Sequence, residues 1–317
     1  MNSIAELAYK LKQRDMSAIL IVYFNRPKHL KNLLLSLQNF KPHKLYFSCD
    51  GARDGNRFDQ ENILECKRII EDIVHWECNK TFINAEFNYG CDEWVPKSIS
   101  WFFSHEVQGI ILEDDCIVDK NFYHFASSLL EKYAGNENIM SISAQSYEEY
   151  SLTSDGDYHF SCYPLTWGWA TWKRSWDHYQ SEVSQEKYDQ IIKNWLISNG
   201  FQHEEIKYWN KFILRLELNQ VTYWDAKWVY SVWLRNAYSI TPNQNLVKNI
   251  GYGSDATHTK SLFDIPHLKL NTIKIPLRHP GSNHIAVDKD RKTFYRKFKF
   301  TAKKKFFYIL KLLLGNR

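Results

Sequence analysis

The 317-residue sequence lacks the features of membrane-spanning, secreted and zinc-binding proteins. Its apolar runs fall well short of the ~20 residues that a helix needs to cross a bilayer, and no secretory signal peptide is recognisable. The six cysteines are scattered, with no C-x-x-C pair and no zinc-like spacing. We therefore expect free thiols in a reducing, cytoplasmic compartment.

Internal repeats and low-complexity segments are also missing, which argues against a solenoid or a long disordered linker. The content of 44% hydrophobic and 24% charged residues is ordinary for a soluble globular protein. Aromatic residues, at 16%, are the exception. Planar apolar faces with polar edges suit sugars and nucleobases, although most of these side chains must form core.

Positive charge is concentrated near the C-terminal end. Ten of the 41 Lys and Arg residues, and none of the 36 acids, fall in residues 291–317, so the remainder holds 31 basic residues and carries a net charge of −5. A body of this charge is not expected to bind nucleic acid. Apolar residues recur at helical spacing among these lysines, which predicts a basic amphipathic helix on an anionic membrane surface. A tail docked on the acidic body is the alternative.

Apolar runs and amphipathic helices alternate in the first half of the chain. Buried strands are predicted at residues 18–24, 44–48, 81–84 and around 110–112, with helices between them. Connections of this length favour parallel crossovers, so the pattern predicts an α/β sheet.

Three consecutive acids end the fourth of these strands. Glu113, Asp114 and Asp115 would lie at the carboxyl end of the strand, where open α/β sheets bind ligands. Packed carboxylates repel one another unless a cation neutralises them, and a divalent ion bridging to phosphate oxygens would do so. The alternative is a solvated acidic turn.

Other strand ends bring polar groups to the same predicted edge. Asn25 and Arg26 precede a helix, and a helix N-terminus beside an arginine favours phosphate. Asp50 follows the second strand and could accept hydrogen bonds from a base or a ribose, or simply form a local turn. Asn88 and Gly90 lie in the loop after the third strand.

The second half of the chain adds three candidates. Trp167 and Trp169 flank Gly168, which allows close backbone approach, so the cluster could stack on a sugar or belong to the core. Asp225 is expected to cap a helix, and a carboxylate desolvated among indoles could also act as a general base. His258, in a loop, is a candidate metal ligand or a solvated histidine.

The order of these motifs is similar to that of GT-A glycosyltransferases over roughly residues 18–258. The matching pieces are strands ending in Asn-Arg and in Cys-Asp-Gly, an Asn-x-Gly loop, the Glu-Asp-Asp, the Gly-Trp and a Trp-Asp at a helix start. The sequence most resembles the N-acetylglucosaminyltransferase I type and bacterial family 2-like sugar transferases of polysaccharide loci. This resemblance implies a GT-A, Rossmann-like fold with a mostly parallel sheet flanked by helices and a helical, aromatic acceptor side.

The resemblance also implies roles for individual residues. Arg26 looks like a diphosphate contact, Asp50 a base contact and Glu113 a ribose contact. Asp115 looks like the ligand of Mn²⁺ or Mg²⁺, and Asp225 like the base that deprotonates the acceptor hydroxyl. The remaining donor positions are Asn25, Asn88, Gly90 and Asp114, the acceptor or sugar platform is Trp167, Gly168 and Trp169, and His258 is a further, less secure metal ligand.

The expected function is that of a metal-dependent, inverting glycosyltransferase of bacterial surface polysaccharide synthesis. It would move a sugar from a nucleotide diphosphate donor, expected to be UDP-linked, to a glycan or lipid-linked acceptor. The expected organisation is a leading helix (1–17), a nucleotide-sugar-binding half (18–144), an acceptor-binding half (145–285) and a tail (286–317) that places the protein peripherally on the cytoplasmic membrane face.

Two other classes of protein stay open. A sugar-phosphate nucleotidyltransferase could use a similar sheet and metal, but it is expected to carry a glycine-rich loop with a lysine after the first strand. A non-catalytic carbohydrate-binding protein would explain the tryptophans but not acids aligned with a phosphate-binding turn.

Overall fold

The computed structural model describes residues 17–147, 155–251 and 268–299. The expected leading helix, apart from Ser17, lies outside these ranges, as do His258 and residues 300–317. No helix in the described ranges is long and apolar enough to cross a membrane.

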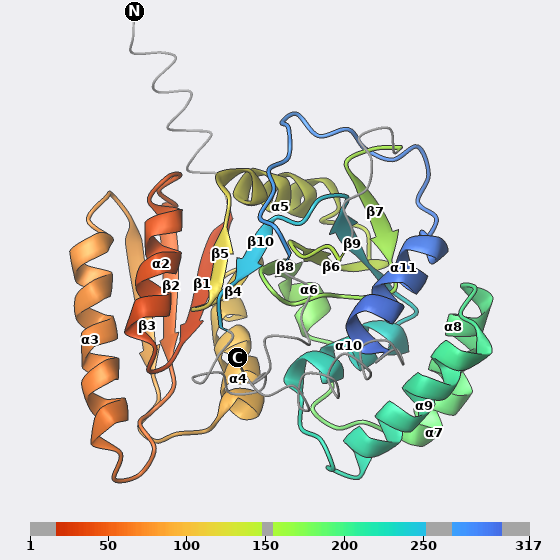
Figure 1. The fold of residues 1–317 in the computed structure, drawn as a ribbon, viewed down its shortest axis with the longest axis horizontal. Helices are drawn as coiled ribbons and strands as arrows, with labels where there is room; N and C mark the ends of the chain where they lie inside the picture. The colour runs from red at the N-terminus through yellow and green to blue at the C-terminus, as the bar shows by residue number, and fades with distance from the viewer. Residues whose placement is uncertain (1–16, 148–154, 252–267, 300–317) are drawn as a thin grey trace, which may run out of the picture.

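A single eight-stranded sheet runs through both halves of the chain in the order β3-β2-β1-β4-β8-β6-β9-β7 (Figure 1). Neighbouring strands from β3 to β4 are parallel, β8 is antiparallel to both of its neighbours, and β6 and β9 are again parallel. Its strands are β1 (Ala18–Tyr23), β2 (Lys44–Cys49), β3 (Asn79–Asn84), β4 (Gln108–Glu113), β6 (Ile139–Ser143), β7 (Tyr158–Ser161), β8 (Trp169–Trp172) and β9 (Tyr238–Pro242). The predicted mostly parallel α/β sheet is confirmed.

A second, two-stranded sheet pairs β5 (Cys116–Val118) with β10 (Val247–Asn249). The helical elements are α2 (Pro27–Leu37), α3 (Arg57–Ile73), α4 (Cys91–Phe103), α5 (Lys120–Lys132), α6 (Lys173–Trp176), α7 (Gln185–Lys187), α8 (Lys193–Ser198), α9 (His203–Glu217), α10 (Trp224–Leu234), α11 (Val287–Thr293) and the π-helical segments η1 (Tyr188–Ile192) and η2 (Phe294–Phe298). Because β10 falls in a stretch rich in Asn and Gly, its sequence predicted only a loop.

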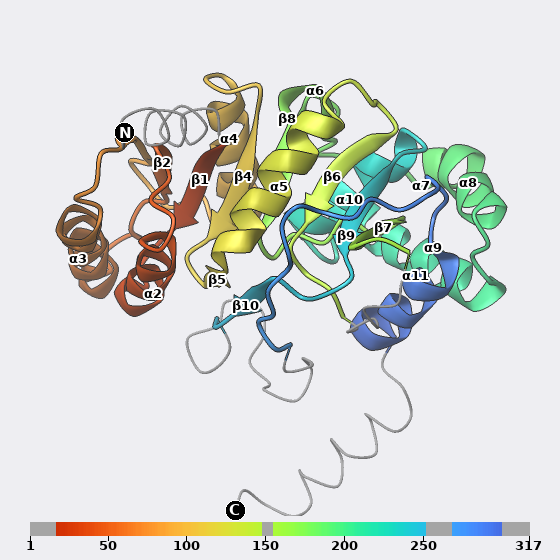
Figure 2. The ribbon, with the colours of Figure 1, turned by 90° about the horizontal axis from the view of Figure 1, so that it is seen from above.

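Two apolar layers hold helices on opposite faces of the sheet (Figure 2). Ile19 and Ile21 of β1 face a core shared with α2, α3 and α5, whereas Leu20 and Val22 face one shared with α4, α6 and α10. Every residue of β1 is buried, which is why its sequence is continuously apolar.

The strand directions gather several loops at one edge of the sheet. The carboxyl ends of β1, β2, β3, β4, β6 and β9 share this edge, and antiparallel β8 begins there. Helix α10 packs against α4. The Lys227–Asp92 ion pair, at 2.9 Å, joins the N-terminal ends of the two helices.

A third apolar cluster lies where η1, α8, α9 and α10 pack together. These helices are at the opposite end of the molecule from strands β1, β2 and β3 (Figure 1). Phe294 of η2 is fully buried in it, and Phe298 packs against the same cluster. The expectation that the tail forms a membrane-associating helix from residue 286 is therefore wrong for residues 287–299, because their apolar side chains face the protein's own core.

Candidate functional site

Arg26 and the acids after β4 form the centre of the candidate site. The Arg26 guanidinium pairs with both carboxylate oxygens of Asp114, with Nε 3.2 Å from Oδ2, and reaches Asp115 Oδ2 at 3.1 Å. The backbone delivers these groups side by side because β1 and β4 are adjacent and parallel. Arg26 thus supplies the positive charge that keeps the two acids together.

The environment raises the pKa values of two acids. Burial raises the pKa of Glu113 to about 8, and the charge of Asp115 adds to the shift while Arg26 opposes it. Burial also raises the pKa of Asp114 to about 6 in spite of its pairing with Arg26. The acids therefore compete for one guanidinium, and the site favours the arrival of further positive charge.

The segment that follows β10 packs closely against Asp115. Asn249 Nδ2 donates to Asp115 Oδ1 at 3.1 Å, and the Ile250 amide donates to the Asp115 carbonyl at 2.9 Å. A Cβ on Gly251 would lie 2.0 Å from Asp115 Oδ2, so only glycine allows this loop to approach the carboxylate. The sequence did not single out Asn249, the last residue of β10, or Gly251, two residues after it.

The Asp115 carboxylate could supply one ligand to a hard divalent cation that is shared with a substrate. In residues 17–147, 155–251 and 268–299, no three His, Cys, Asp or Glu side chains form a ready metal cage. Mg²⁺ often needs only one or two protein carboxylates, because substrate phosphates and water complete its shell. Asp115 offers one such carboxylate, and its two oxygens accept hydrogen bonds from Arg26 Nη1 and Asn249 Nδ2.

Asp50 organises the turn after β3. Its two oxygens accept hydrogen bonds from the amides of Gly51, Tyr89 and Gly90 at 2.8–2.9 Å and from Asn88 Nδ2 at 3.1 Å. A carboxylate has about four lone-pair sites, so all are engaged. Burial raises the pKa of Asp50, against the effect of these amides. The structure therefore gives Asp50 a positioning role in this turn, and its expected contact with a base stays a prediction.

Asn25 is tied to a network that the sequence did not reveal. Its Nδ2 donates to Asp59 Oδ1 at 2.6 Å, and Arg53 binds the same carboxylate through Nε at 2.6 Å and Nη2 at 2.7 Å. Asp59 is fully buried, and the hydrogen bond from Arg53 is the main reason that its pKa is lowered. The network fixes the β1 turn against the start of α3.

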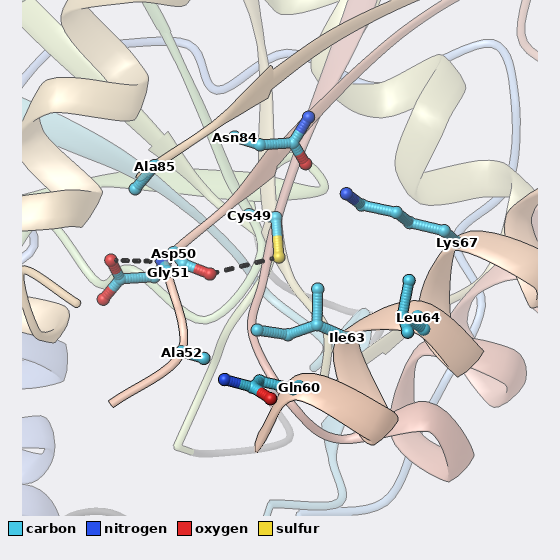
Figure 3. A pocket seen from close by; sticks show the side chains of 10 residues that line it. All are labelled: Cys49, Asp50, Gly51, Ala52, Gln60, Ile63, Leu64, Lys67, Asn84 and Ala85. Carbon is cyan, nitrogen blue, oxygen red and sulfur yellow. Dashed lines mark hydrogen bonds between the residues drawn. The ribbon is translucent and has the colours of Figure 1, made fainter. Parts of the chain in front are cut away.

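An open pocket of about 280 Å³ lies beyond the ends of β2 and β3 (Figure 3). Lys67 and Asn84 lie on one side of it, Asp50 and Gly51 on another, and Ile63 of α3 forms an apolar wall. A Cβ on Gly51 would lie 2.4 Å from the Phe87 carbonyl carbon, so the loops that border the pocket pack closely. The pocket combines an apolar wall with polar groups, as ligand sites do.

Asp225 lies in the first turn of α10. The helix begins at Trp224 with Tyr223 as its N-cap, so the expectation that Asp225 caps the helix is wrong, and its Oδ1 accepts from the Ala226 amide at 3.0 Å. Burial is the main cause of the raised pKa of Glu113, and the charge of Asp225 also contributes. The Lys227–Asp92 ion pair fixes this first turn of α10 against the start of α4.

The tryptophan cluster divides between core and edge. Trp169 is 1% exposed and packs against the rings of Trp228 and Trp224 at 5.6 and 6.1 Å. Its expected place in a sugar platform is therefore wrong, because the side chain is buried in the core. Trp167 is only partly buried, and Gly168, with φ of 60°, adopts a conformation that favours glycine.

The fold and the sheet edge define a Rossmann-like α/β protein. No family model and no curated protein matches the chain. Among solved structures it is distantly similar to 4-diphosphocytidyl-2C-methyl-D-erythritol synthase from Anaerococcus prevotii (TM-score 0.33, 10% identity, 65% of this chain and 86% of that one). It is also similar to a UDP-glucose pyrophosphorylase in complex with UDP-glucose (TM-score 0.27, 10% identity, 46% of this chain and 63% of that one). A third similar structure is the glycosyltransferase GlyE of Streptococcus pneumoniae (TM-score 0.29, 12% identity, 65% of this chain and 44% of that one). Similarities this distant do not identify the chemistry of the site.

Proposed function

We propose that the protein is a glycosyltransferase that moves a sugar from a nucleotide diphosphate donor to a hydroxyl of a glycan or lipid-linked acceptor. The observation that carries this proposal is the Arg26 guanidinium held by Asp114 and Asp115 at the sheet edge, with Asp225 on a separate helix nearby. In this proposal Arg26 and the acids after β4 serve the diphosphate of the donor, and Asp225 accepts the proton of the acceptor.

The donor is proposed to lie across the ends of β4, β1 and β2. Adjacent strands are about 4.8 Å apart, so the acids after β4 and the loop after β2 are separated by about 10 Å, a span that suits an extended nucleoside diphosphate. The base would enter the pocket beside Ile63 and Lys67, with the amide of Asn84 available to its polar edge. The sugar would then lie toward Asp225.

In the proposed reaction Asp225 accepts the proton of the acceptor hydroxyl. The oxygen attacks the anomeric carbon, a new C–O bond forms, and the bond to the diphosphate breaks with its electron pair leaving on phosphate. A single displacement inverts the configuration of the anomeric carbon. Arg26 stays hydrogen-bonded to Asp114 and Asp115 throughout the reaction and keeps their carboxylates in place. A divalent cation bound at Asp115 would offset the charge of the diphosphate.

Calorimetry tests the donor side of this proposal. Wild-type protein is expected to bind UDP with Mn²⁺ at least tenfold more tightly than without it, and Asp115→Asn should remove most of this gain. Asp177→Asn is the matched control, because Asp177 is exposed and pairs with Lys173 on α6. Metal-dependent binding that survives in Asp115→Asn would refute the assignment of this carboxylate.

The same titration separates the alternative classes. A carbohydrate-binding protein is expected to bind no UDP under any metal condition. A nucleotidyltransferase is expected to bind a nucleoside triphosphate in preference to UDP, yet the Asn25-Arg26 turn lacks the glycine-rich loop and lysine that such enzymes use.

A further inference from the structure

Asn249, at the end of β10, connects this strand to the acids after β4. In the two-stranded sheet it pairs directly with Cys116, the residue after Asp115. Its Oδ1 accepts from the Gly251 amide at 2.8 Å, and its Nδ2 donates to Asp115 Oδ1 at 3.1 Å. Because the Gly251 amide engages the oxygen of the side-chain amide, the NH₂ group is the end that faces the carboxylate. Asn249 is therefore a hydrogen-bond donor with a fixed orientation.

The segment from Asn249 to Gly251 is also held by its backbone. The Ile250 amide donates to the Asp115 carbonyl at 2.9 Å, and the Ile250 carbonyl oxygen lies 3.2 Å from His29 Nε2 on α2. The segment is thus attached both to the turn after β4 and to the helix after β1.

The two carboxylate oxygens of Asp115 accept different numbers of hydrogen bonds. Oδ1 accepts from Asn249 Nδ2 and from the Cys116 thiol at 3.5 Å, which engages both of its lone pairs. Among the described residues, Oδ2 accepts only from Arg26 Nη1, at 3.1 Å. One lone pair of Oδ2 is therefore available to a ligand.

Gly251 allows the Asp115 carboxylate to adopt this position. A Cβ at residue 251 would lie 2.0 Å from Asp115 Oδ2 and 2.8 Å from Asp115 Cγ, so the carboxylate occupies the space that a side chain would need. The φ angle of Gly251 is outside the left-handed region, so the close approach is what requires glycine here. Any larger residue would displace either the segment or the carboxylate.

We propose that Asn249 and Gly251 are positioning residues that orient Asp115 so that Oδ2 is the oxygen offered to a divalent cation. This rests on the proposed function, in which Asp115 and the donor diphosphate share that cation. One carboxylate oxygen is sufficient for a cation such as Mg²⁺ when phosphate oxygens and water complete its shell. Without Asn249 Nδ2, the carboxylate would lose the hydrogen bond that sets its orientation. Partners of this kind typically change metal affinity by about 10- to 100-fold.

Calorimetry of UDP binding with and without Mn²⁺ tests the role of Asn249. Asn249→Ala is expected to lower UDP affinity about tenfold in the presence of Mn²⁺ and to leave the affinity without Mn²⁺ unchanged. Because Asn249 acts through Asp115, adding Asn249→Ala to Asp115→Asn should cause no further loss. A purely structural role would instead lower the two affinities together.

Gly251→Ala provides a second, independent variant. It is expected to remove the Mn²⁺-dependent gain as well, because the added Cβ displaces the Asp115 carboxylate. Lys248→Ala is the control for Asn249, since adjacent residues of β10 point to opposite faces of the strand. Gly135→Ala is the control for Gly251, since a Cβ at residue 135 would meet nothing within 4 Å. Both controls should keep the full gain.

Three results would overturn the proposal: an Mn²⁺-dependent gain that survives in Asn249→Ala, an equal loss of affinity with and without Mn²⁺, or a further loss when Asn249→Ala is added to Asp115→Asn. If wild-type protein shows no Mn²⁺-dependent gain in UDP affinity, the proposed donor site itself fails. That result is distinct from a wild-type gain that Asn249→Ala retains, which leaves the proposed function in place and removes only the role of Asn249.

Discussion

The buried carboxyl of Asp290 predicts that stability falls as pH rises. Burial raises its pKa from 3.8 to about 7, although the Ser161 hydroxyl and Cys162 amide favour the ionised form. The unfolded chain ionises near 3.8, so this group's contribution is fully present below pH 4 and is lost as pH rises through 7. One pKa unit corresponds to about 1.4 kcal/mol, so the loss is about 4 kcal/mol at most.

Asp290→Asn is the informative change. The amide oxygen can accept from the Cys162 amide and the amide nitrogen can donate to Ser161 Oγ, so both contacts survive without a charge. The variant should match wild type near pH 4.5 and exceed it by a few kcal/mol at pH 8.

Urea unfolding followed by tryptophan fluorescence at several pH values measures this difference. Asp288→Asn is the control, because Asp288 lies on the same helix with its side chain 92% exposed. A difference between Asp290→Asn and wild type that stays constant from pH 5 to pH 8 would refute the reasoning, as would a variant that is the less stable protein at pH 8.

Three substitutions extend the account. Asp225→Asn should lower turnover about 10²- to 10⁴-fold with UDP affinity unchanged, since it removes only proton transfer; turnover within a few-fold of wild type would show that another group is the base. Arg26→Met should cost about 3–5 kcal/mol in urea unfolding, because Asp114 is left buried and unpaired; a neutral effect would mean that the pair is dispensable. Gly51→Ala should cost about 1–3 kcal/mol, because its Cβ would meet the Phe87 backbone at 2.4 Å, and unfolding unchanged from wild type would count against that packing.

Strands β1, β2 and β4 were predictable because burial on both faces makes their sequences continuously apolar. Strand β8 was not, because its first residue, Trp169, was interpreted as part of a sugar platform. Strand β10, at three residues, is too short to show any periodicity. Short strands take their conformation from pairing with neighbours, which a local pattern does not report.

The candidate site shows the same limit. Its residue types and strand ends could be read from the sequence, and Arg26, Asp114 and Asp115 do meet. The number of hydrogen-bond donors around Asp50 could not be read from the sequence, because two of them are backbone amides in a turn almost forty residues away. Residues 287–299 were assigned to a membrane helix because amphipathic spacing predicts a buried face without identifying what buries it.

The most direct test of the central claim is ³¹P NMR of the protein with Mn²⁺ and a panel of UDP-, dTDP-, GDP- and CDP-sugars, each with a polysaccharide-derived acceptor mixture. The account predicts that one donor is converted to its nucleoside diphosphate by wild type, and at least 10²-fold more slowly by Asp225→Asn. Conversion of no donor, or formation of a nucleoside triphosphate when pyrophosphate is added, would contradict it.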